Sequence, residues 1–478
     1  MSKVLVISPD TIPIGKNLAA GPGIRSFEIA RALHRKGHDI TIAVPKVYYN
    51  NEQNDEFNIV DWNIWDKVNL GEICNEQDCV IAPPPGLGLA DFSSLYINSV
   101  RDNLPTVIDA YDPNLIECIN GLIYSERENL LLFSKYLNAM VPLLKRGDFF
   151  ACANERQRYY YIGVLNVLGR INPLTYDKKI VDIVPFGVPD KEAVHEKNVL
   201  KGKIVNEEDF VILWTGGIYP WFDAITLVKA MEKVVTEVKN AKLIFMGGKH
   251  PRMHAHPQSY YKTQKLVKKL GMLNKNIFFL EQWVPWSEMQ NYYLESDLAV
   301  NTHPMHLETE FSFRTRVINY IWGGLPIITT EGDEISETLK KYNCGEIVEP
   351  ENPNKLAEIM VDLFSDEKKR KNMSKNAKKL AKKMSWSNVI NPIDEFCKNP
   401  QIAEDRKNEF ARRTVLSAVD TLQRHKIMLE TKRINIGSHE ETQLRFLIRM
   451  GFWTFKELGP LETAKRVREF LIVKKRRN

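Results

Sequence analysis

The stretch that decides the fold runs from Ile24 to Pro45 and reads IRSFEIARALHRKGHDITIAVP. Its first part carries apolar residues at helical spacing, and Lys36-Gly37-His38 is typical of a helix end. The apolar run ITIAV that follows predicts a buried strand, and KVLVIS, which begins at Lys3, predicts another strand before the helix. A strand, a helix and a second strand in this order form a βαβ unit, which implies a parallel, doubly wound sheet.

Outward from this unit, two series of strands alternate with helix-like segments. In the first series, CVIAPPP, PTVIDAYDP, DFFACAN and IVDIVPFGVP begin at Cys79, Pro105, Asp148 and Ile180. In the second, DFVILWTGG, AKLIFMGG, NIFFLEQW, SDLAVNTHP and PIITTEGD begin at Asp209, Ala241, Asn276, Ser296 and Pro326. The polar residues 187–205 lie between the series, so we predict two α/β halves. Ligands of such sheets bind beyond the carboxyl ends of the strands.

The charge of the chain is unevenly distributed. The 478 residues carry a net charge of +6, but residues 404–478 alone carry 18 Lys and Arg against 10 Asp and Glu, which leaves the rest of the chain at −2. This tail is predicted to be helical, either as an appendage packed on the body or as a basic, aromatic surface that binds an anionic membrane or a partner enzyme. The aromatic and leucine residues concerned are Phe446, Leu447, Phe452, Trp453 and Phe470. We expect no nucleic-acid partner.

Cysteine usage and hydropathy indicate the compartment. The six cysteines show neither a C-x-x-C pair nor zinc-like spacing, which is typical of free thiols in a reducing environment. No signal peptide is recognised, and no apolar run approaches the roughly 18 residues that a membrane helix needs. We therefore expect a cytoplasmic protein, with any contact to the inner face of the cell membrane being peripheral.

The segment ETEFSFRTRVINYIWGGLP, from Glu308 to Pro326, places Arg314 and Arg316 where a helix should begin. A helix N-terminus already carries partial positive charge, so arginines there need a negative partner. A bound phosphate would suit both the guanidinium groups and the free N–H groups of the helix. The alternative is that Glu308 and Glu310 are the partners, and the segment alone does not separate the two interpretations.

Three further loops at strand ends are candidates for binding. Gly21 and Gly23 precede the first helix, and Gly216 and Gly217 follow a strand of the second half, so a phosphate or sugar can approach the backbone at both places. The third loop, GGKHPRMHAHP, offers Lys249 and His250 as phosphate contacts. Its histidines lack the spacing and the acidic ligand of a metal site, so we expect no bound metal and no cofactor. The chain also contains no D-x-D motif.

Carboxylates follow a strand of the first half in VIDAYDPNLIE. Asp109 and Asp112 can accept a hydroxyl proton or hold sugar hydroxyls. The alternative is that Asp112-Pro113 is only a turn and a helix start. The segment CANERQRYYYIG, which follows another strand, can likewise be part of a site or a solvated helix.

Taken together, these segments resemble the GT-B glycosyltransferases, and within them the retaining family-4 group. The motifs that carry the resemblance are GPGIRSFEIA, DAYDP, CANERQRYYYIG, VPFGVP, GGIYPWFD, GGKHP, ETEFSFRTRVINYIWGGLP and TTEGD, several of which are closest to a bacterial, mostly uncharacterised subgroup. The resemblance covers about residues 1–400. It implies a Rossmann-like acceptor domain at 1–190 and a Rossmann-like donor domain at 205–385 facing a cleft, followed by a crossover helix and basic helical extension at 386–478.

The resemblance also implies roles for residues. Gln282, Trp283 and Val284 should meet the nucleobase, Gly216 and Gly217 the diphosphate, and Gly21 and Gly23 the diphosphate or acceptor. The stretch from Glu308 to Arg316, with Glu310, Phe311 and Ser312, should surround the donor sugar and phosphates. Asp109 and Asp112 occupy the loop where many relatives carry a histidine that faces the reacting sugar.

Two departures from the relatives matter. Their E-x7-E pair falls here on Phe311 and Asn319, which makes ribose recognition by Asn319 doubtful. Their diphosphate-gripping Arg and Lys are replaced by GGIYPWFD, a role that Arg314 and Arg316 are expected to take over.

The function implied is transfer of a hexosyl or deoxyhexosyl unit from a UDP-, GDP- or dTDP-linked donor to a glycan or lipid-linked acceptor in surface polysaccharide synthesis. Retention of configuration and independence of metal are expected, with Asp109, Asp112, Glu308 and Arg314 at the reacting centre. The alternatives are a nucleotide-sugar 2-epimerase or hydrolase, and a non-catalytic scaffold subunit of the same fold.

Overall fold

The computed structural model describes residues 1–49, 54–63, 66–83, 92–120, 126–248 and 257–416. Residues Met1–Lys407 form one compact unit, and the chain from Asn408 belongs to a second. The described part of the second unit is α18 (Glu409–Ala411) and a π-helical turn (Arg412–Leu416). The aromatic residues predicted for a tail surface lie outside the described residues. None of the helices in the described ranges combines the length and apolar run that a membrane span needs.

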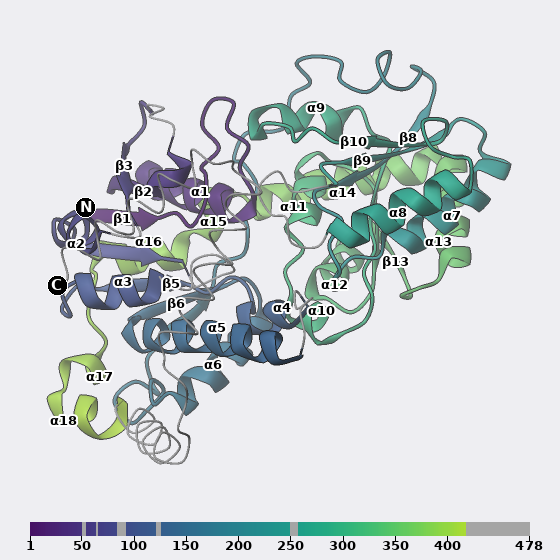
Figure 1. Cartoon of the computed structure of the whole chain (residues 1–478). Helices are drawn as coiled ribbons and strands as arrows, with labels where there is room; N and C mark the ends of the chain where they lie inside the picture. The colour runs from purple at the N-terminus through teal and green to yellow at the C-terminus, as the bar shows by residue number, and fades with distance from the viewer. Residues whose placement is uncertain (50–53, 64–65, 84–91, 121–125, 249–256, 417–478) are drawn as a thin grey trace, which may run out of the picture. The chain divides into compact units, whose positions relative to one another are not determined.

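The N-terminal half is built on a parallel sheet, which in the described residues has seven strands in the order β3-β2-β1-β4-β5-β6-β7 (Figure 1). The strands are β1 (Lys3–Ile7), β2 (Asp39–Pro45), β3 (Asn58–Trp62), β4 (Cys79–Ala82), β5 (Thr106–Asp109), β6 (Phe149–Cys152) and β7 (Val181–Ile183). The helices are α1 (Gly21–Arg35), α2 (Lys67–Asn75), α3 (Phe92–Ser99), α4 (Asn114–Asn120), α5 (Glu126–Arg146) and α6 (Glu155–Val167).

The C-terminal half repeats this plan with six described strands in the order β10-β9-β8-β11-β12-β13. They are β8 (Phe210–Thr215), β9 (Ala241–Met246), β10 (Ile277–Leu280), β11 (Leu298–Asn301), β12 (Ile327–Thr330) and β13 (Gly345–Val348). The helices are α7 (Ala224–Glu237), α8 (Pro257–Lys269), α9 (Met289–Leu294), α10 (Leu307–Phe311), α11 (Thr315–Trp322), α12 (Glu334–Lys341), α13 (Pro353–Ser365) and α14 (Glu367–Lys383).

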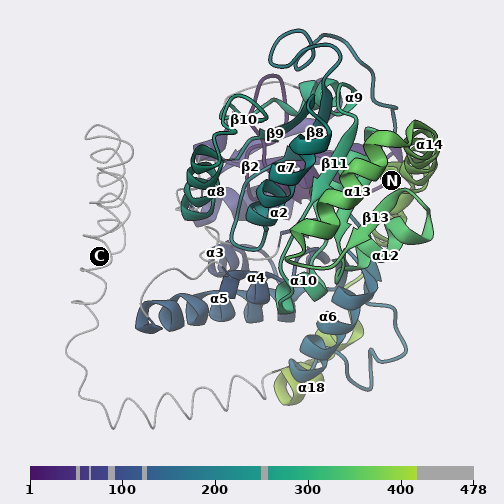
Figure 2. The same ribbon diagram turned by 90° about the vertical axis from the view of Figure 1, so that its right-hand side faces the viewer.

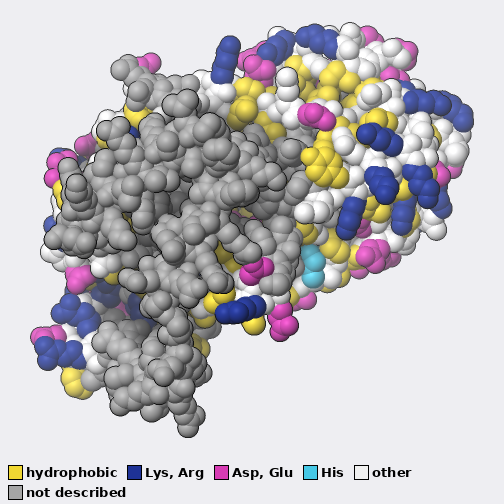
Figure 3. All heavy atoms as spheres, in the orientation of Figure 1, with side chains coloured by type: hydrophobic (Ala, Val, Ile, Leu, Met, Phe, Trp, Pro, Cys, Tyr) yellow, Lys and Arg dark blue, Asp and Glu magenta, His cyan; other side chains and the backbone are white. Residues whose placement is uncertain are grey.

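Strand β8 of the C-terminal sheet is buried on both faces. Ile212 and Trp214 of β8 belong to the core under α7 and α13, which lie side by side in Figure 2, whereas Val211 and Leu213 face the opposite core. This alternation follows from the two-residue period of a strand. Lys and Arg side chains of this half are exposed over α7 and α8 (Figure 3), so buried arginines are exceptions that need an explanation.

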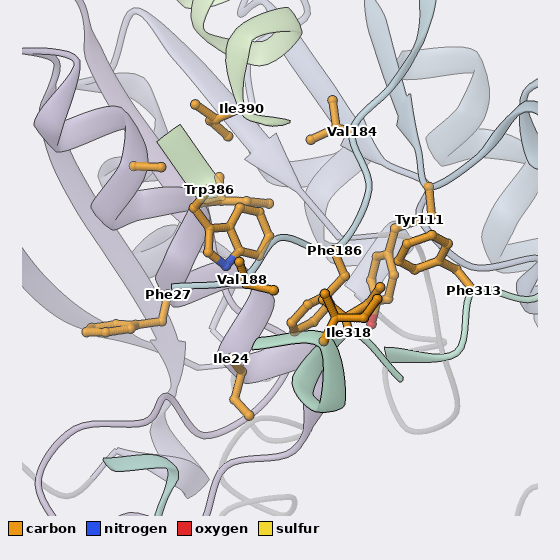
Figure 4. Close-up of a cluster of buried hydrophobic side chains, with 14 of the residues drawn as sticks. Ile24, Phe27, Tyr111, Val184, Phe186, Val188, Phe313, Ile318, Trp386 and Ile390 are labelled. Atoms are coloured by element: carbon orange, nitrogen blue, oxygen red, sulfur yellow. The ribbon is translucent and has the colours of Figure 1, made fainter. Parts of the chain in front are cut away.

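One hydrophobic core runs through both halves. After α14 the chain returns to the N-terminal half as α15 (Trp386–Val389) and α16 (Asn391–Lys398), and α17 (Glu404–Lys407) ends the compact unit. Figure 4 shows Tyr111 and Phe186 of the N-terminal half beside Phe313 and Ile318 of the C-terminal half. The two halves are therefore joined by packed apolar side chains as well as by the linker.

The predicted fold class of two Rossmann-like α/β halves is confirmed. Strands β3 and β13 are absent from the sequence prediction, and both lie at a sheet edge where NIVDW and GEIV are only partly buried. An edge strand needs no continuous apolar run, and such a run was the signal on which the prediction depended.

Candidate active site

The segment from Glu308 to Arg316 lies beyond β11, at the point where the strand order of the C-terminal sheet reverses between β8 and β11. This is the switch point at which open α/β sheets bind ligands. Helix α10 is capped by His306, whose Nδ1 accepts from the N–H of Thr309 at 3.2 Å. Helix α11 begins directly after Arg314, and no side chain caps it. The two arginines thus stand at the start of a helix, as the sequence indicates.

Arg314 has a carboxylate partner within the protein. Its two terminal nitrogens donate to the two oxygens of Glu308, each at 2.8 Å, and Nη2 also contacts the Thr309 hydroxyl. Asp333 lies 3.9 Å from Nε and holds a buried contact with His303 at 3.4 Å. Arg314 is 4% exposed, so this network fixes its position firmly. Glu308 is therefore the carboxylate partner of Arg314 within the chain, as the alternative to a bound phosphate predicted.

Arg316 is buried in a different way. Its Nη2 donates to the carbonyl of Gly217 at 2.8 Å, and its guanidinium lies 3.7 Å from the centre of the Phe222 ring and 4.7 Å from that of Trp214. Among the described residues no carboxylate lies within 4.0 Å of it, and the buried Nη1 has no hydrogen-bond partner. Burial lowers the pKa of Arg316 to about 10, so the group stays charged at neutral pH.

The glycines at the ends of β8 and β9 leave space around this guanidinium. Gly216 adopts a φ of +78°, and a Cβ atom there would lie 3.4 Å from Nη2 of Arg316. Gly247, with a φ of +80°, faces the Trp283 indole, which a Cβ atom would approach to 3.5 Å. Trp283 lies between Gln282 and Val284, just beyond β10. The predicted nucleobase loop, the glycine loop and Arg316 are therefore neighbours at one edge of the sheet. Lys249 and His250 lie outside the described residues.

The remaining predicted residues of this segment differ in burial and in the groups that they contact. The Glu310 side chain is exposed, Phe311 packs on Tyr160 with ring centres 5.6 Å apart, and Ser312 is buried. Asn319 lies one turn after Arg316 on the same face of α11, and its buried Oδ1 has no partner in the described part of the chain.

In the N-terminal half, Asp109 forms a buried salt bridge with Arg25. Both carboxylate oxygens accept from this fully buried arginine, at 2.6 and 2.7 Å, and Arg25 also donates to the carbonyls of Val184 and Pro185. The two glycines of the first loop also differ from each other. A Cβ atom on Gly23 would meet the Thr11 carbonyl at 1.9 Å, whereas one on Gly21 would lie 4.0 Å from the Thr315 hydroxyl of the other half. The Arg25–Asp109 pair and the close packing at Gly23 thus stabilise the N-terminal half. Gly21 faces the start of α11.

Asp112 and Glu117 form a carboxylate pair beside Glu308. Helix α4, which carries Glu117, packs on α10, which carries Glu308. Burial raises the pKa of Asp112 to about 7, with Asp109 and Glu308 adding to the rise, and burial together with Asp112 and Glu308 holds the pKa of Glu117 well above its usual range. Both carboxyls are therefore harder to ionise than exposed ones. Glu117 is absent from the predicted site, although its position in the first turn of α4 follows from its spacing after Asp112.

Comparisons with known proteins identify the fold first. Sucrose-phosphate synthase (tll1590) from Thermosynechococcus elongatus superposes with a TM-score of 0.61, at 14% identity over 83% of this chain and 98% of that one. Anabaena Alr3699/HepE in complex with UDP-glucose gives 0.59 at 12% identity over 83% and 100%, and WaaG, a glycosyltransferase involved in lipopolysaccharide biosynthesis, gives 0.56 at 15% identity over 83% and 100%. The chain has the GT-B fold, as the motifs predict.

A family model matches within the C-terminal half. Residues 196–380 match the family Glycosyl transferases group 1. "Putative glycosyltransferase YtcC" of Bacillus subtilis (strain 168) is 23% identical over 176 residues, which are 36% of this chain. The matched segment spans 41% of the length of that relative.

Proposed function

We propose that the chain transfers a hexosyl or deoxyhexosyl unit from a nucleoside diphosphate sugar to a glycan or lipid-linked acceptor. The observation that carries the proposal is the buried, charged guanidinium of Arg316 on α11, whose Nη1 has no hydrogen-bond partner and which has no carboxylate partner among the described residues. A buried charge without a partner is costly, and a diphosphate would supply the missing negative charge. Neighbours of the same fold support this, since HepE is described in complex with UDP-glucose.

The chemistry requires charge stabilisation on the leaving group. When the bond between the anomeric carbon and the phosphate oxygen breaks, the electron pair stays on the diphosphate. Nη1 of Arg316 and the free N–H groups at the start of α11 stabilise that charge without a metal ion. Arg314, fixed by Glu308, keeps the loop in place, and Trp283 beyond β10 borders the space for the nucleobase.

The acceptor is proposed to lie on the side of the N-terminal half, where Asp112 follows β5 and Glu308 of α10 contributes to its raised pKa. A carboxyl with a pKa of about 7 can receive a hydrogen bond from the attacking hydroxyl or hold a sugar hydroxyl. In a retaining reaction the hydroxyl proton passes to the departing phosphate, so no protein nucleophile is required. Surface polysaccharide synthesis at the cytoplasmic face of the membrane would supply a lipid-linked acceptor.

The test is a binding screen of the purified protein against UDP-, GDP- and dTDP-sugars and the free nucleotides, with and without EDTA. A nucleotide at about 100 times its dissociation constant should stabilise the protein by about 2.7 kcal/mol, unchanged by EDTA. Turnover of the bound sugar without any acceptor would instead indicate an epimerase or hydrolase. Nucleotide binding without turnover by any acceptor would indicate a scaffold, and no binding at all would contradict the proposal.

A further inference from the structure

The start of α6, which the function above does not use, is bonded to the end of α10, just before α11 with Arg316 begins. Three successive carbonyls, those of the last two residues of α10 and of the residue after it, each accept a hydrogen bond from a side chain of the N-terminal half. Nη1 of Arg156 donates to Glu310 at 3.1 Å, Nε2 of Gln157 to Phe311 at 2.9 Å and Nδ2 of Asn154 to Ser312 at 3.3 Å. We call Asn154, Arg156 and Gln157 the carbonyl clasp.

The clasp is itself fixed from both sides. Asn154 caps α6 by accepting from the N–H of Gln157, and Oε1 of Gln157 accepts from the N–H of Ala153, both at 2.8 Å. Gln157 is fully buried and Asn154 is 1% exposed. Arg156 reaches further into the C-terminal half, where it donates to the carbonyl of Gly332 and to the carboxylate of Glu337, each at 2.6 Å. These hydrogen bonds restrict the orientation of the three side chains.

The clasp binds the backbone directly before the arginines of the candidate site. The three carbonyls immediately precede Phe313 and Arg314, and α11 with Arg316 follows without any side-chain cap of its own. Residues 312–314 join α10 to α11 and belong to no strand of the described residues, so we expect their backbone to be oriented by the end of α10, by the Glu308–Arg314 pair and by the clasp. We propose that Asn154, Arg156 and Gln157 are positioning residues for the donor site, so that donor affinity of the C-terminal half depends on residues of the opposite half.

This inference rests on the proposed function, and its experiment separates the two. Gln157→Glu keeps the oxygen that accepts from Ala153 and removes the N–H donor to Phe311. Arg158→Ala is the matched control, because Arg158 lies next to Gln157 on α6 but pairs with Glu155 of the same helix. Arg156→Lys is a second variant at a less buried position, which protects the test if Gln157→Glu does not fold.

Two measurements are made on the full chain. Hydrogen exchange of the amides of residues 308–316 needs no ligand, and calorimetry uses UDP, GDP and dTDP as probes. We expect faster exchange in the loop and at least about tenfold weaker nucleotide binding in Gln157→Glu and Arg156→Lys, with both readouts unchanged in Arg158→Ala. In an Arg316→Ala background, Gln157→Glu should cause little further loss of binding, because the clasp acts through Arg316.

Unchanged exchange in both clasp variants would overturn the inference. Faster exchange with unchanged nucleotide affinity would also overturn it, since the clasp would then be structural only. If the unaltered chain binds none of the three nucleotides, the proposed function fails and the clasp fails as a donor-positioning device with it, whatever the exchange rates show.

Discussion

Buried arginines differ in what neutralises them. Among the described residues, Arg25, Arg170, Arg314 and Arg406 are buried against carboxylates, and Arg146 donates to two backbone carbonyls. Within the same described residues, Arg316 contacts a single carbonyl and two aromatic rings and has no carboxylate partner. Replacing Arg314 and replacing Arg316 should therefore change the free energy of unfolding in opposite directions.

Arg316→Ala should reduce turnover at least about a hundredfold, the usual effect of losing one group that stabilises charge in the transition state. Its free energy of unfolding should stay constant or rise, because an uncompensated buried charge is removed. Steady-state kinetics and denaturant unfolding of the same preparation measure both. Near-normal kcat and nucleotide affinity would contradict the role given to Arg316.

Arg314→Ala should lower the free energy of unfolding by about 3–5 kcal/mol, because it leaves Glu308 buried without its partner. Turnover should also fall at least about a hundredfold, here through loss of the loop geometry. Denaturant unfolding separates this variant from Arg316→Ala. An unchanged free energy of unfolding in Arg314→Ala would contradict a stabilising role of the Glu308–Arg314 pair.

Asp112 should make stability depend on pH. Its pKa in the folded protein is about 7, above the value in an unfolded chain, so ionisation is costly only in the folded state. Its favourable contribution is therefore complete below about pH 4 and is lost as the pH rises through 7. Asp112→Asn should raise the free energy of unfolding by about 1–2 kcal/mol at pH 8 and change it little at pH 4. Chemical denaturation at the two pH values tests this, and an equal effect at both would contradict it.

At the scale of elements, Gly23 shows how closely α1 approaches the loop after β1. Gly23→Ala would push a methyl group to 1.9 Å from the Thr11 carbonyl, so we expect a loss of more than about 3 kcal/mol or failure to fold. Gly163→Ala is the control. Gly163 lies within α6 with nothing near its Cβ position, and alanine there should stabilise by about 0.5–1 kcal/mol. Thermal unfolding compares the two, and a mild effect of Gly23→Ala would mean that the loop can move away.

Local patterns predicted the elements but not the contacts between them. The end of α1 before Lys36 and the Arg-bearing start of α11 are both confirmed, because each depends on neighbouring residues. The pairing of Asp109 with Arg25, 84 residues away, was not predictable from spacing. The contact of Arg316 with two aromatic rings was also not predictable from the sequence. The clasp was not predictable either, because an N-cap residue such as Asn154 gives no sign that its amide also donates to the other half.

At the scale of the whole molecule, the compact unit ends after α17. Asp405 pairs with the fully buried Arg170, and Arg406 pairs with Asp148. Truncation after residue 403 should therefore leave buried charges on the N-terminal half and cost at least about 3 kcal/mol, whereas truncation after Lys407 should leave the unfolding transition unchanged. Thermal and denaturant unfolding of both products measure this. Equal stability of the two would show that α17 contributes nothing.

Truncation after Lys407 also tests the tail. We expect the shortened protein to keep its turnover of soluble substrates and to bind phosphatidylserine-containing vesicles more weakly than the full chain, because residues 404–478 carry the excess of positive charge. Vesicle co-sedimentation measures this. Equal vesicle binding of both proteins would contradict a membrane-binding role.

The apolar core shared by the two halves has a consequence for recombination. Phe313 and Ile318 pack beside Tyr111 and Phe186, so each half completes its hydrophobic core with side chains that the other encodes. A chimaera that grafts the N-terminal half of another protein with the GT-B fold onto this C-terminal half would place foreign side chains against Phe313 and Ile318. Its success should depend on matching the apolar side chains that the two halves share in this core, with Tyr111, Phe186, Phe313 and Ile318 among them. Exchange of whole halves between proteins of this fold is thus restricted, in this chain, by the shared core.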